Sequence, residues 1–178
     1  MDVSVSYVLG FVVGLLITMG FFIISSLVRK NKGKPCEYDE RQLLARGKAY
    51  KAAFFVLIVY LLVEGSFKLV TGIEWADSMT RSFIGICLSV TVFAIICILN
   101  DAYLSLKEKP AHCIAVFSLI AFVNLAVVLA NYFLKVSFLS EGMLNYHIIN
   151  FIILIMFAVI MVVFIGKLLH DKKTEKME

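Results

Sequence analysis

The stretch from residue 36 to residue 72, CEYDERQLLARGKAYKAAFFVLIVYLLVEGSFKLVTG, decides how this chain is built. It opens with a charged segment, 38–51, and continues without a proline into an apolar segment that runs from about Ala52 to Leu69. An apolar helix of about 17–25 residues is long enough to cross the hydrocarbon core of a bilayer. We therefore expect one continuous helix, with amphipathic first turns beside the membrane and a remainder that crosses it.

The composition places the whole chain in a membrane. Hydrophobic residues make up 61% and charged residues 17% of the 178 residues, whereas soluble domains have about 45–50% and about 25%. Further apolar runs of spanning length lie at 5–28, 82–99, 111–133 and 148–169. The sequence predicts an all-α polytopic membrane protein in which residues 1–178 form a single membrane domain with five transmembrane helices.

The distribution of cations predicts the orientation. Fourteen of the 17 Lys and Arg residues fall in 29–51, in 107–109 and in the segment from 167 onward, and the other three are Lys68, Arg81 and Lys135. Lys and Arg concentrate on the cytoplasmic side of membrane proteins. We expect an N-out, C-in, multi-pass protein of the plasma membrane. Its net charge of +4 then reflects topology and contact with the anionic inner leaflet, and we expect no nucleic-acid partner.

Glu64 is an ionisable residue inside a predicted span, and such residues usually face the protein interior. Lys68 follows one turn later, a spacing that favours an ion pair within the helix. At 1.5 Å per residue, Asn124 stands at nearly the same depth on its own span, and Asn131 follows it two turns on. Two interpretations remain open: a structural ion pair, or an outward-facing polar pocket formed by Glu64, Lys68, Asn124 and Asn131.

The charged segment 38–51 is a second candidate site. Its candidate residues for contact with lipid or with a partner are Asp39, Glu40, Arg41, Gln42, Arg46 and Lys48. A basic amphipathic helix lies readily on an anionic leaflet. The segment could therefore only set the topology, or it could be a docking surface for a cytoplasmic or membrane partner.

The string YDERQLLARGKAYKAAF at 38–54 resembles the D-E-R-Q motif of small, uncharacterised membrane proteins of Gram-positive bacteria. In that family, too, the motif stands just before a transmembrane helix. The resemblance covers about seventeen residues. The resemblance implies a bacterial plasma membrane. It says nothing further about function, because that family has no assigned activity or cofactor.

Motifs of catalysis are missing from the sequence, which contains no G-x-x-x-x-G-K-[ST], H-E-x-x-H or G-x-S-x-G pattern. His112, His147 and His170 are far apart and lie near predicted helix ends. We expect no enzymatic activity, no cofactor and no metal site. The sequence favours an accessory or regulatory membrane subunit that acts through helix packing and through the 38–51 helix, with another membrane protein as an expected partner. The alternative is a small transporter or solute-binding subunit with a pocket around Glu64.

Overall fold

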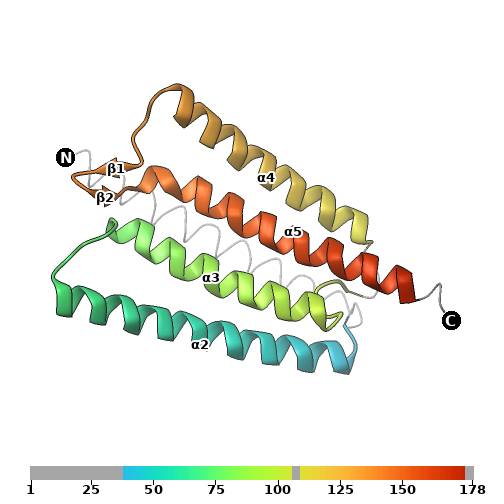
Figure 1. Cartoon of the computed structure of the whole chain (residues 1–178). Helices are drawn as coiled ribbons and strands as arrows, with labels where there is room; N and C mark the ends of the chain where they lie inside the picture. The colour runs from blue at the N-terminus through green and yellow to red at the C-terminus, as the bar shows by residue number, and fades with distance from the viewer. Residues whose placement is uncertain (1–37, 106–108, 175–178) are drawn as a thin grey trace, which may run out of the picture. The chain divides into compact units, whose positions relative to one another are not determined.

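A computed structural model describes residues 38–105 and 109–174 (Figure 1). Within these ranges the chain is all-α, as predicted, apart from one short β-hairpin and one turn of 3-10 helix. The helices are α2 (Glu40–Thr71), α3 (Ser78–Leu99), α4 (Pro110–Phe133) and α5 (Ile149–Thr174), the strands are β1 (Leu139–Ser140) and β2 (Met143–Leu144), and the 3-10 turn is η1 (Tyr146–Ile148).

Each of the four described helices is long and apolar enough to cross a membrane. They coincide with the last four spans predicted from the sequence, and α2 is continuous from the charged segment into the apolar one. The predicted first span, 5–28, lies outside the described residues. The expected count of five spans and the N-out orientation therefore stay predictions.

The ends of α2 follow from local chemistry. At its start, Asp39 Oδ1 accepts a hydrogen bond from the Gln42 backbone N–H at 2.6 Å, and Gln42 Oε1 accepts one from the Asp39 N–H at 3.2 Å. This reciprocal capping box satisfies two N–H groups that a helix start leaves without partners. At its end, Gly72 adopts a φ of 65°, a left-handed conformation that glycine takes at little cost.

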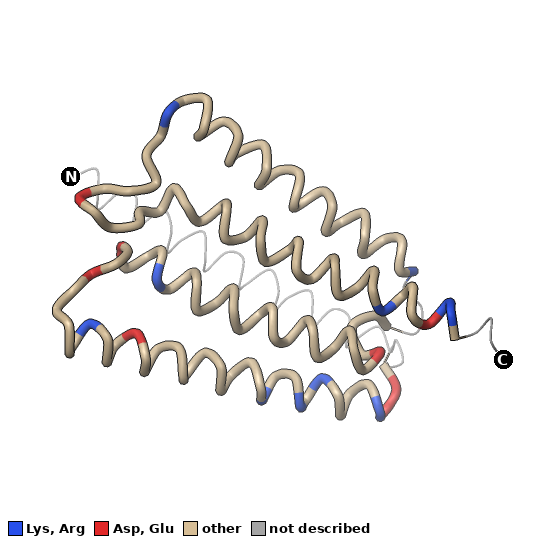
Figure 2. The backbone as a smooth tube through the Cα atoms, viewed as in Figure 1, with Lys and Arg blue, Asp and Glu red and all other residues tan. Residues whose placement is uncertain are grey.

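The four helices form a single row. α2 packs on α3, α3 on α5, and α5 on α4, so that α2 and α4 lie at the two edges (Figure 1). We call the end at which α2 and α4 begin the basic end, because most of the described Lys and Arg residues lie there (Figure 2). The opposite end, which carries β1 and β2, is the hairpin end.

Small residues bring α2 and α3 close together. Ala45, Ala49 and Ala53 recur every four residues on α2 and are buried. Such a stripe lets two backbones approach within a membrane. The Ser89 hydroxyl of α3 donates to the Ala53 carbonyl oxygen at 2.9 Å, so the two helices are also joined by a hydrogen bond.

An aromatic core joins the other helices near the basic end. Its buried members are Ala94, Ile98, Phe117, Ile160 and Phe164. The Phe117 ring centroid lies 5.6 Å from that of Phe157 and 6.5 Å from that of Phe164. This core lies away from Glu64, in the half of the row where α3 and α5 end.

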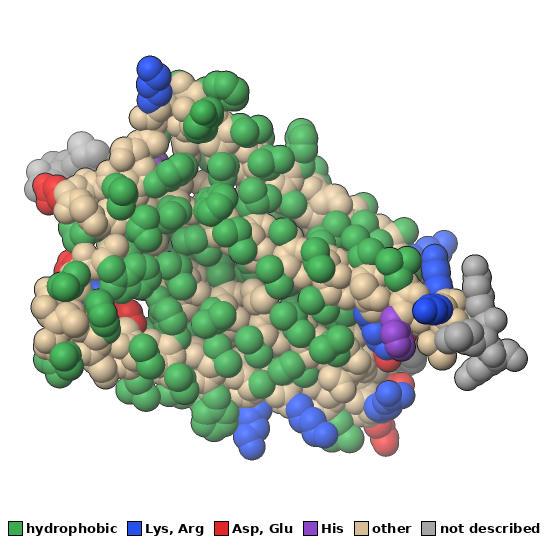
Figure 3. Space-filling model, in the orientation of Figure 1, with side chains coloured by type: hydrophobic (Ala, Val, Ile, Leu, Met, Phe, Trp, Pro, Cys, Tyr) green, Lys and Arg blue, Asp and Glu red, His purple; other side chains and the backbone are tan. Residues whose placement is uncertain are grey.

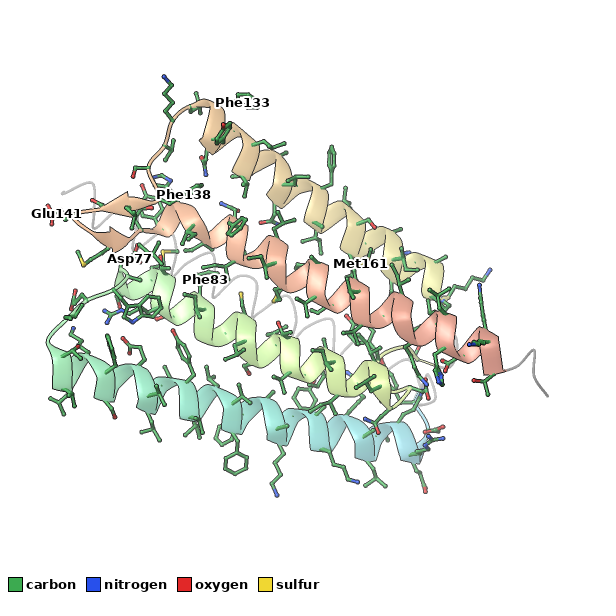
Figure 4. All side chains as sticks on the ribbon, in the orientation of Figure 1. Asp77, Phe83, Phe133, Phe138, Glu141 and Met161 are labelled. Carbon is green, nitrogen blue, oxygen red and sulfur yellow. The ribbon has the colours of Figure 1, made fainter. Side chains whose placement is uncertain are left out.

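The two links at the hairpin end are hydrogen-bonded to each other. Glu141 and Gly142 both have positive φ, 53° and 82°, and form the two-residue turn between β1 and β2, where Figure 4 shows Glu141 at the tip. The Leu144 N–H donates to the Trp75 carbonyl oxygen at 3.0 Å, and the Asp77 N–H donates to the Leu144 carbonyl oxygen at 2.8 Å. The start of α3 is thereby fixed against the link that follows α4.

Apolar side chains dominate the surface between the two ends (Figure 3). Large residues such as Leu62, Leu69, Phe122 and Val162 are more than half exposed. A soluble monomer rarely exposes a continuous apolar surface of this extent, whereas a bilayer covers it. The surface therefore agrees with the spanning lengths of the helices.

Candidate functional site

Glu64 forms an ion pair with Arg81 of α3. Its Oε1 accepts a hydrogen bond from Arg81 Nη1 at 2.6 Å, and the two side chains are 20% and 10% exposed. Lys68, the partner expected from the sequence, instead lies on Glu74, with Nζ 2.6 Å from Oε1. The expected pairing of Glu64 with Lys68 is therefore wrong.

The hairpin geometry explains this exchange of partners. Glu64 stands eight residues before Gly72, and Arg81 stands nine residues after it. Two antiparallel helices joined at such a turn bring residues equally distant from it to the same level. Lys68 is one turn closer to the link, and its side chain reaches Glu74 there.

Arg81 is held by a second contact. The Tyr60 hydroxyl of α2 donates to the Arg81 carbonyl oxygen at 2.7 Å. Gly85 leaves the room that the Tyr60 ring needs, because a Cβ built on Gly85 would lie only 2.5 Å from a ring carbon. Tyr60, Arg81 and Gly85 were not predicted as site residues, although the register of the hairpin could have identified Arg81.

The Lys68–Glu74 pair is more exposed, because 51% of the Lys68 side chain and 42% of the Glu74 side chain are accessible to solvent. The hydrogen bond that Lys68 donates, together with its positive charge, lowers the pKa of Glu74 below the ordinary value. Glu74 is therefore ionised and paired at neutral pH. This pair lies at the surface, beside the more buried pair formed by Glu64 and Arg81.

A small cleft opens beside these pairs. Its volume is about 160 Å³, and its lining residues are Tyr60, Leu61, Glu64, Lys68, Ser78, Arg81 and Ser82. Pockets for drug-sized ligands have about 300–1,000 Å³. The cleft therefore has room for a chemical group of a few heavy atoms.

Asn124 and Asn131 do not line this cleft. Both belong to α4, which lies at the opposite edge of the row from α2. Asn124 is buried, and its Nδ2 donates to the Ile120 carbonyl oxygen of its own helix at 2.8 Å. The structure thus brings Glu64 and Lys68 to one cleft and keeps Asn124 and Asn131 apart from it.

Part of the charged segment is directed into the protein. Gln42 is 9% exposed, and its Nε2 donates to the carbonyl oxygens of Asp101 at 2.6 Å and Leu104 at 3.3 Å. Arg46 Nη1 donates to the Ala102 carbonyl oxygen at 3.2 Å. These bonds tie the first turns of α2 to the loop that follows α3.

The other candidate residues of this segment face outward. Glu40, Arg41 and Lys48 are exposed, as are Leu44 and Tyr50. The predicted contact surface therefore divides into two parts. Asp39, Gln42 and Arg46 serve the fold, and Glu40, Arg41 and Lys48 remain available to lipid or to a partner.

A second cleft, of about 200 Å³, lies at the basic end between the start of α2, the 101–105 loop and the end of α5. Lys167 crosses it, with Nζ 3.0 Å from Asp171 Oδ1 and 3.3 Å from Asp101 Oδ1. The sequence analysis did not single out this cluster. The spacing of four residues between Lys167 and Asp171 is the signal that could have found part of it.

The part of the chain that the structure describes contains no group of three or more His, Cys, Asp or Glu side chains placed to hold a metal ion. The described part of the chain is helical, and four of its helices are long and apolar enough to cross a membrane. No family model, no curated protein and no solved structure matches the chain in comparisons with known proteins.

Proposed function

We propose that this chain is a non-enzymatic accessory or regulatory subunit of a bacterial plasma membrane, with five spans and its basic end on the cytoplasmic side. Its partners are the anionic inner leaflet and a second membrane protein. The D-E-R-Q motif and the concentration of Lys and Arg at one end support this placement.

The observation that carries the proposal is the divided role of the first turns of α2. Gln42 and Arg46 fasten this segment to the 101–105 loop, while Glu40, Arg41 and Lys48 stay exposed. A surface held rigid before binding loses less conformational entropy when a partner docks. The arrangement therefore suits presentation of a charged face to a partner.

The geometry around Glu64 supports the transporter alternative less well. The Glu64 carboxylate is already paired with Arg81, and the cleft beside it is only about 160 Å³. A coupled carrier site needs a carboxylate that can exchange its partner for an ion or a solute. The paired arrangement is the one that a structural ion pair requires.

Site-specific photocrosslinking in native membranes tests the proposal. Leu44 is exposed one turn after Glu40 and one turn before Lys48, so a photoreactive residue there samples the charged face. We expect a discrete adduct with one membrane protein that is lost when Arg41→Glu and Lys48→Glu are introduced together. A photoreactive residue at Lys172, which is exposed at the end of α5, is the matched control. Lipid adducts alone at both positions would contradict the accessory role.

A further inference from the structure

Two lysines of α2, Lys48 and Lys51, lie just outside the apolar part of the helix. Both are exposed, and neither has an ion pair or a hydrogen bond from its side chain within the described residues. Measured along the helix from Ala52, where the apolar segment begins, they stand about 6 Å and about 1.5 Å outside it. The head-group layer on each side of a bilayer is about 5–7.5 Å thick, so both lysines fall within that layer.

The two lysines are neighbours on the helix surface. They are three residues apart, a spacing that places Cβ atoms about 5–6 Å from each other. Ala49 and Ala53 are buried on the side of α2 that faces α3, and Figure 3 shows Lys and Arg side chains standing out from the free edge of the row along α2. Helical side chains tilt toward the helix N-terminus. In α2 this tilt directs both ammonium groups away from the hydrocarbon and toward the head groups.

An aromatic pair lies on the membrane side of these lysines. Phe54 and Phe55 follow Lys51 by three and four residues, so both are its neighbours on the helix. Both are more than half exposed, and their ring centroids lie 6.0 Å apart in an edge-to-face arrangement. Leu62, about two turns beyond Phe55, is also more than half exposed. The free edge of α2 thus carries two cations at the level of the head groups and an apolar surface along the hydrocarbon.

We propose that Lys48, Lys51 and Phe55 form a binding site for one anionic phospholipid. The two ammonium groups, each with three N–H donors, donate to the two free oxygens of the lipid phosphate, and an acyl chain lies along Phe55 and Leu62. The charges are complementary, because the described chain supplies no counter-ion to either lysine. This inference rests on the proposed placement of the chain in an anionic bilayer, and it identifies the part of α2 that binds the lipid.

The depth of the site separates it from the surface available to a protein partner. Glu40 and Arg41 precede Ala52 by twelve and eleven residues, about 16–18 Å along the helix. They stand beyond the head-group layer, where a protein can reach them and a phospholipid cannot. Lys48 lies between the two levels, so a bound lipid adjoins the surface on which the partner docks.

Native mass spectrometry of the full chain in a neutral detergent tests the site. We expect the wild-type protein to retain phosphatidylglycerol in preference to phosphatidylcholine with the same acyl chains, because the choline group cancels the phosphate charge. Lys48→Gln and Lys51→Gln together should abolish this preference and weaken retention of phosphatidylglycerol by about fivefold for each lysine removed. Both substitutions change exposed side chains, so the variant should fold. Phe55→Ala should weaken retention of both lipids.

Lys172→Gln together with Lys173→Gln is the matched control. These lysines are exposed and follow the apolar segment of α5, which ends at Leu169, by about 4.5–6 Å. Their replacement removes the same charge, but adjacent residues do not face each other on a helix. We expect this variant to retain phosphatidylglycerol as the wild type does. Equal losses in the two double variants would show a response to net charge alone and would overturn the site. Equal retention of the two lipids by the wild type would overturn it as well.

This measurement is made without a second membrane protein. A negative result would therefore remove the lipid site and leave the photocrosslinked protein adduct at Leu44 as evidence for the accessory role. Loss of that adduct alone would contradict the accessory role and leave the lipid site in place.

Discussion

A carboxylate within a membrane helix needs a partner, because hydrocarbon solvates no charge. In this chain the partner of Glu64 comes from the next helix, at 2.6 Å. Burying the pair costs desolvation energy that offsets much of the attraction between the two charges, so the pair itself adds little stability. Removal of one member has a larger effect, because the other charge is then buried without a partner. The informative experiment is therefore to remove one charge and leave the other buried.

We expect Glu64→Gln to destabilise the protein by about 3 kcal/mol, the lower end of the range for breaking a buried ion pair, because Glu64 is 20% exposed. The substitution leaves the Arg81 guanidinium without a counter-charge. Unfolding by sodium dodecyl sulfate in mixed micelles, followed by fluorescence of the single Trp75, measures the effect. Glu74→Gln, which breaks the exposed pair, is the control and should change stability much less. Equal effects of the two variants would show that the buried pair is not special.

At the scale of residues, the sequence predicted that Glu64 needs a partner but not which one. Spacing within one helix favoured Lys68, because i,i+4 contacts can be read from sequence alone. The contact with Arg81 depends on how two helices align across a turn, which needs the position of Gly72 as well. Similarly, Gln42 and Arg46 were predicted as candidates for contact with lipid or with a partner, whereas both donate to the 101–105 loop. Their bonds to the 101–105 loop could not be predicted, because they join segments about 60 residues apart.

At the scale of elements, the hairpin of α2 and α3 depends on one close approach. The Tyr60 ring lies against Gly85, where a Cβ would come within 2.5 Å of a ring carbon. Gly85→Ala should therefore displace the ring, weaken its hydrogen bond to Arg81, and cost about 1–3 kcal/mol, as overpacking does. Gly65→Ala is the matched control, because a Cβ there has no neighbour within 4 Å, and it should be neutral or slightly stabilising. The same detergent titration measures both variants, and a harmless Gly85→Ala would mean that the ring can move freely.

The capping of α2 gives a second prediction for an element. Gln42→Ala removes two hydrogen bonds to the 101–105 loop and half of the capping box, and it should cost about 1–3 kcal/mol. We expect faster hydrogen–deuterium exchange at the Asp101 and Ala102 amides, whose hydrogen bonds hold the end of α3 in place. Arg41→Ala, which changes an exposed neighbour, should leave exchange unchanged. An unchanged loop in Gln42→Ala would show that α2 does not fasten it.

Elements were easier to predict than contacts. Apolar runs identified the four described helices, and Pro110 marked the start of α4, because proline fits the first turn of a helix. The β-hairpin was not predicted, because its strands have only two residues each. Its signal is Glu141–Gly142, a pair whose glycine readily adopts positive φ.

At the scale of the whole molecule, the orientation in the membrane decides which compartment each cleft faces. The basic end holds the exposed charged residues of α2 and the cations at the end of α5 (Figure 2). The cleft beside Glu64 lies toward the hairpin end, because its lining includes Ser78 and Arg81 at the start of α3. Since Lys and Arg stay on the cytoplasmic side during insertion, we expect the hairpin end to face outward.

Single-cysteine labelling tests this orientation directly. Lys48→Cys and Glu141→Cys change exposed residues at the basic end and at the hairpin end, in a background in which the four native cysteines are replaced by alanine. A membrane-impermeant maleimide added to intact cells should label Glu141→Cys, and it should label Lys48→Cys only after the membrane is permeabilised. The reverse pattern would place the charged face of α2 outside the cell. Docking to a cytoplasmic partner through Arg41 and Lys48 would then be impossible, whereas the ion pair between Glu64 and Arg81 would keep its contacts on the opposite side of the membrane.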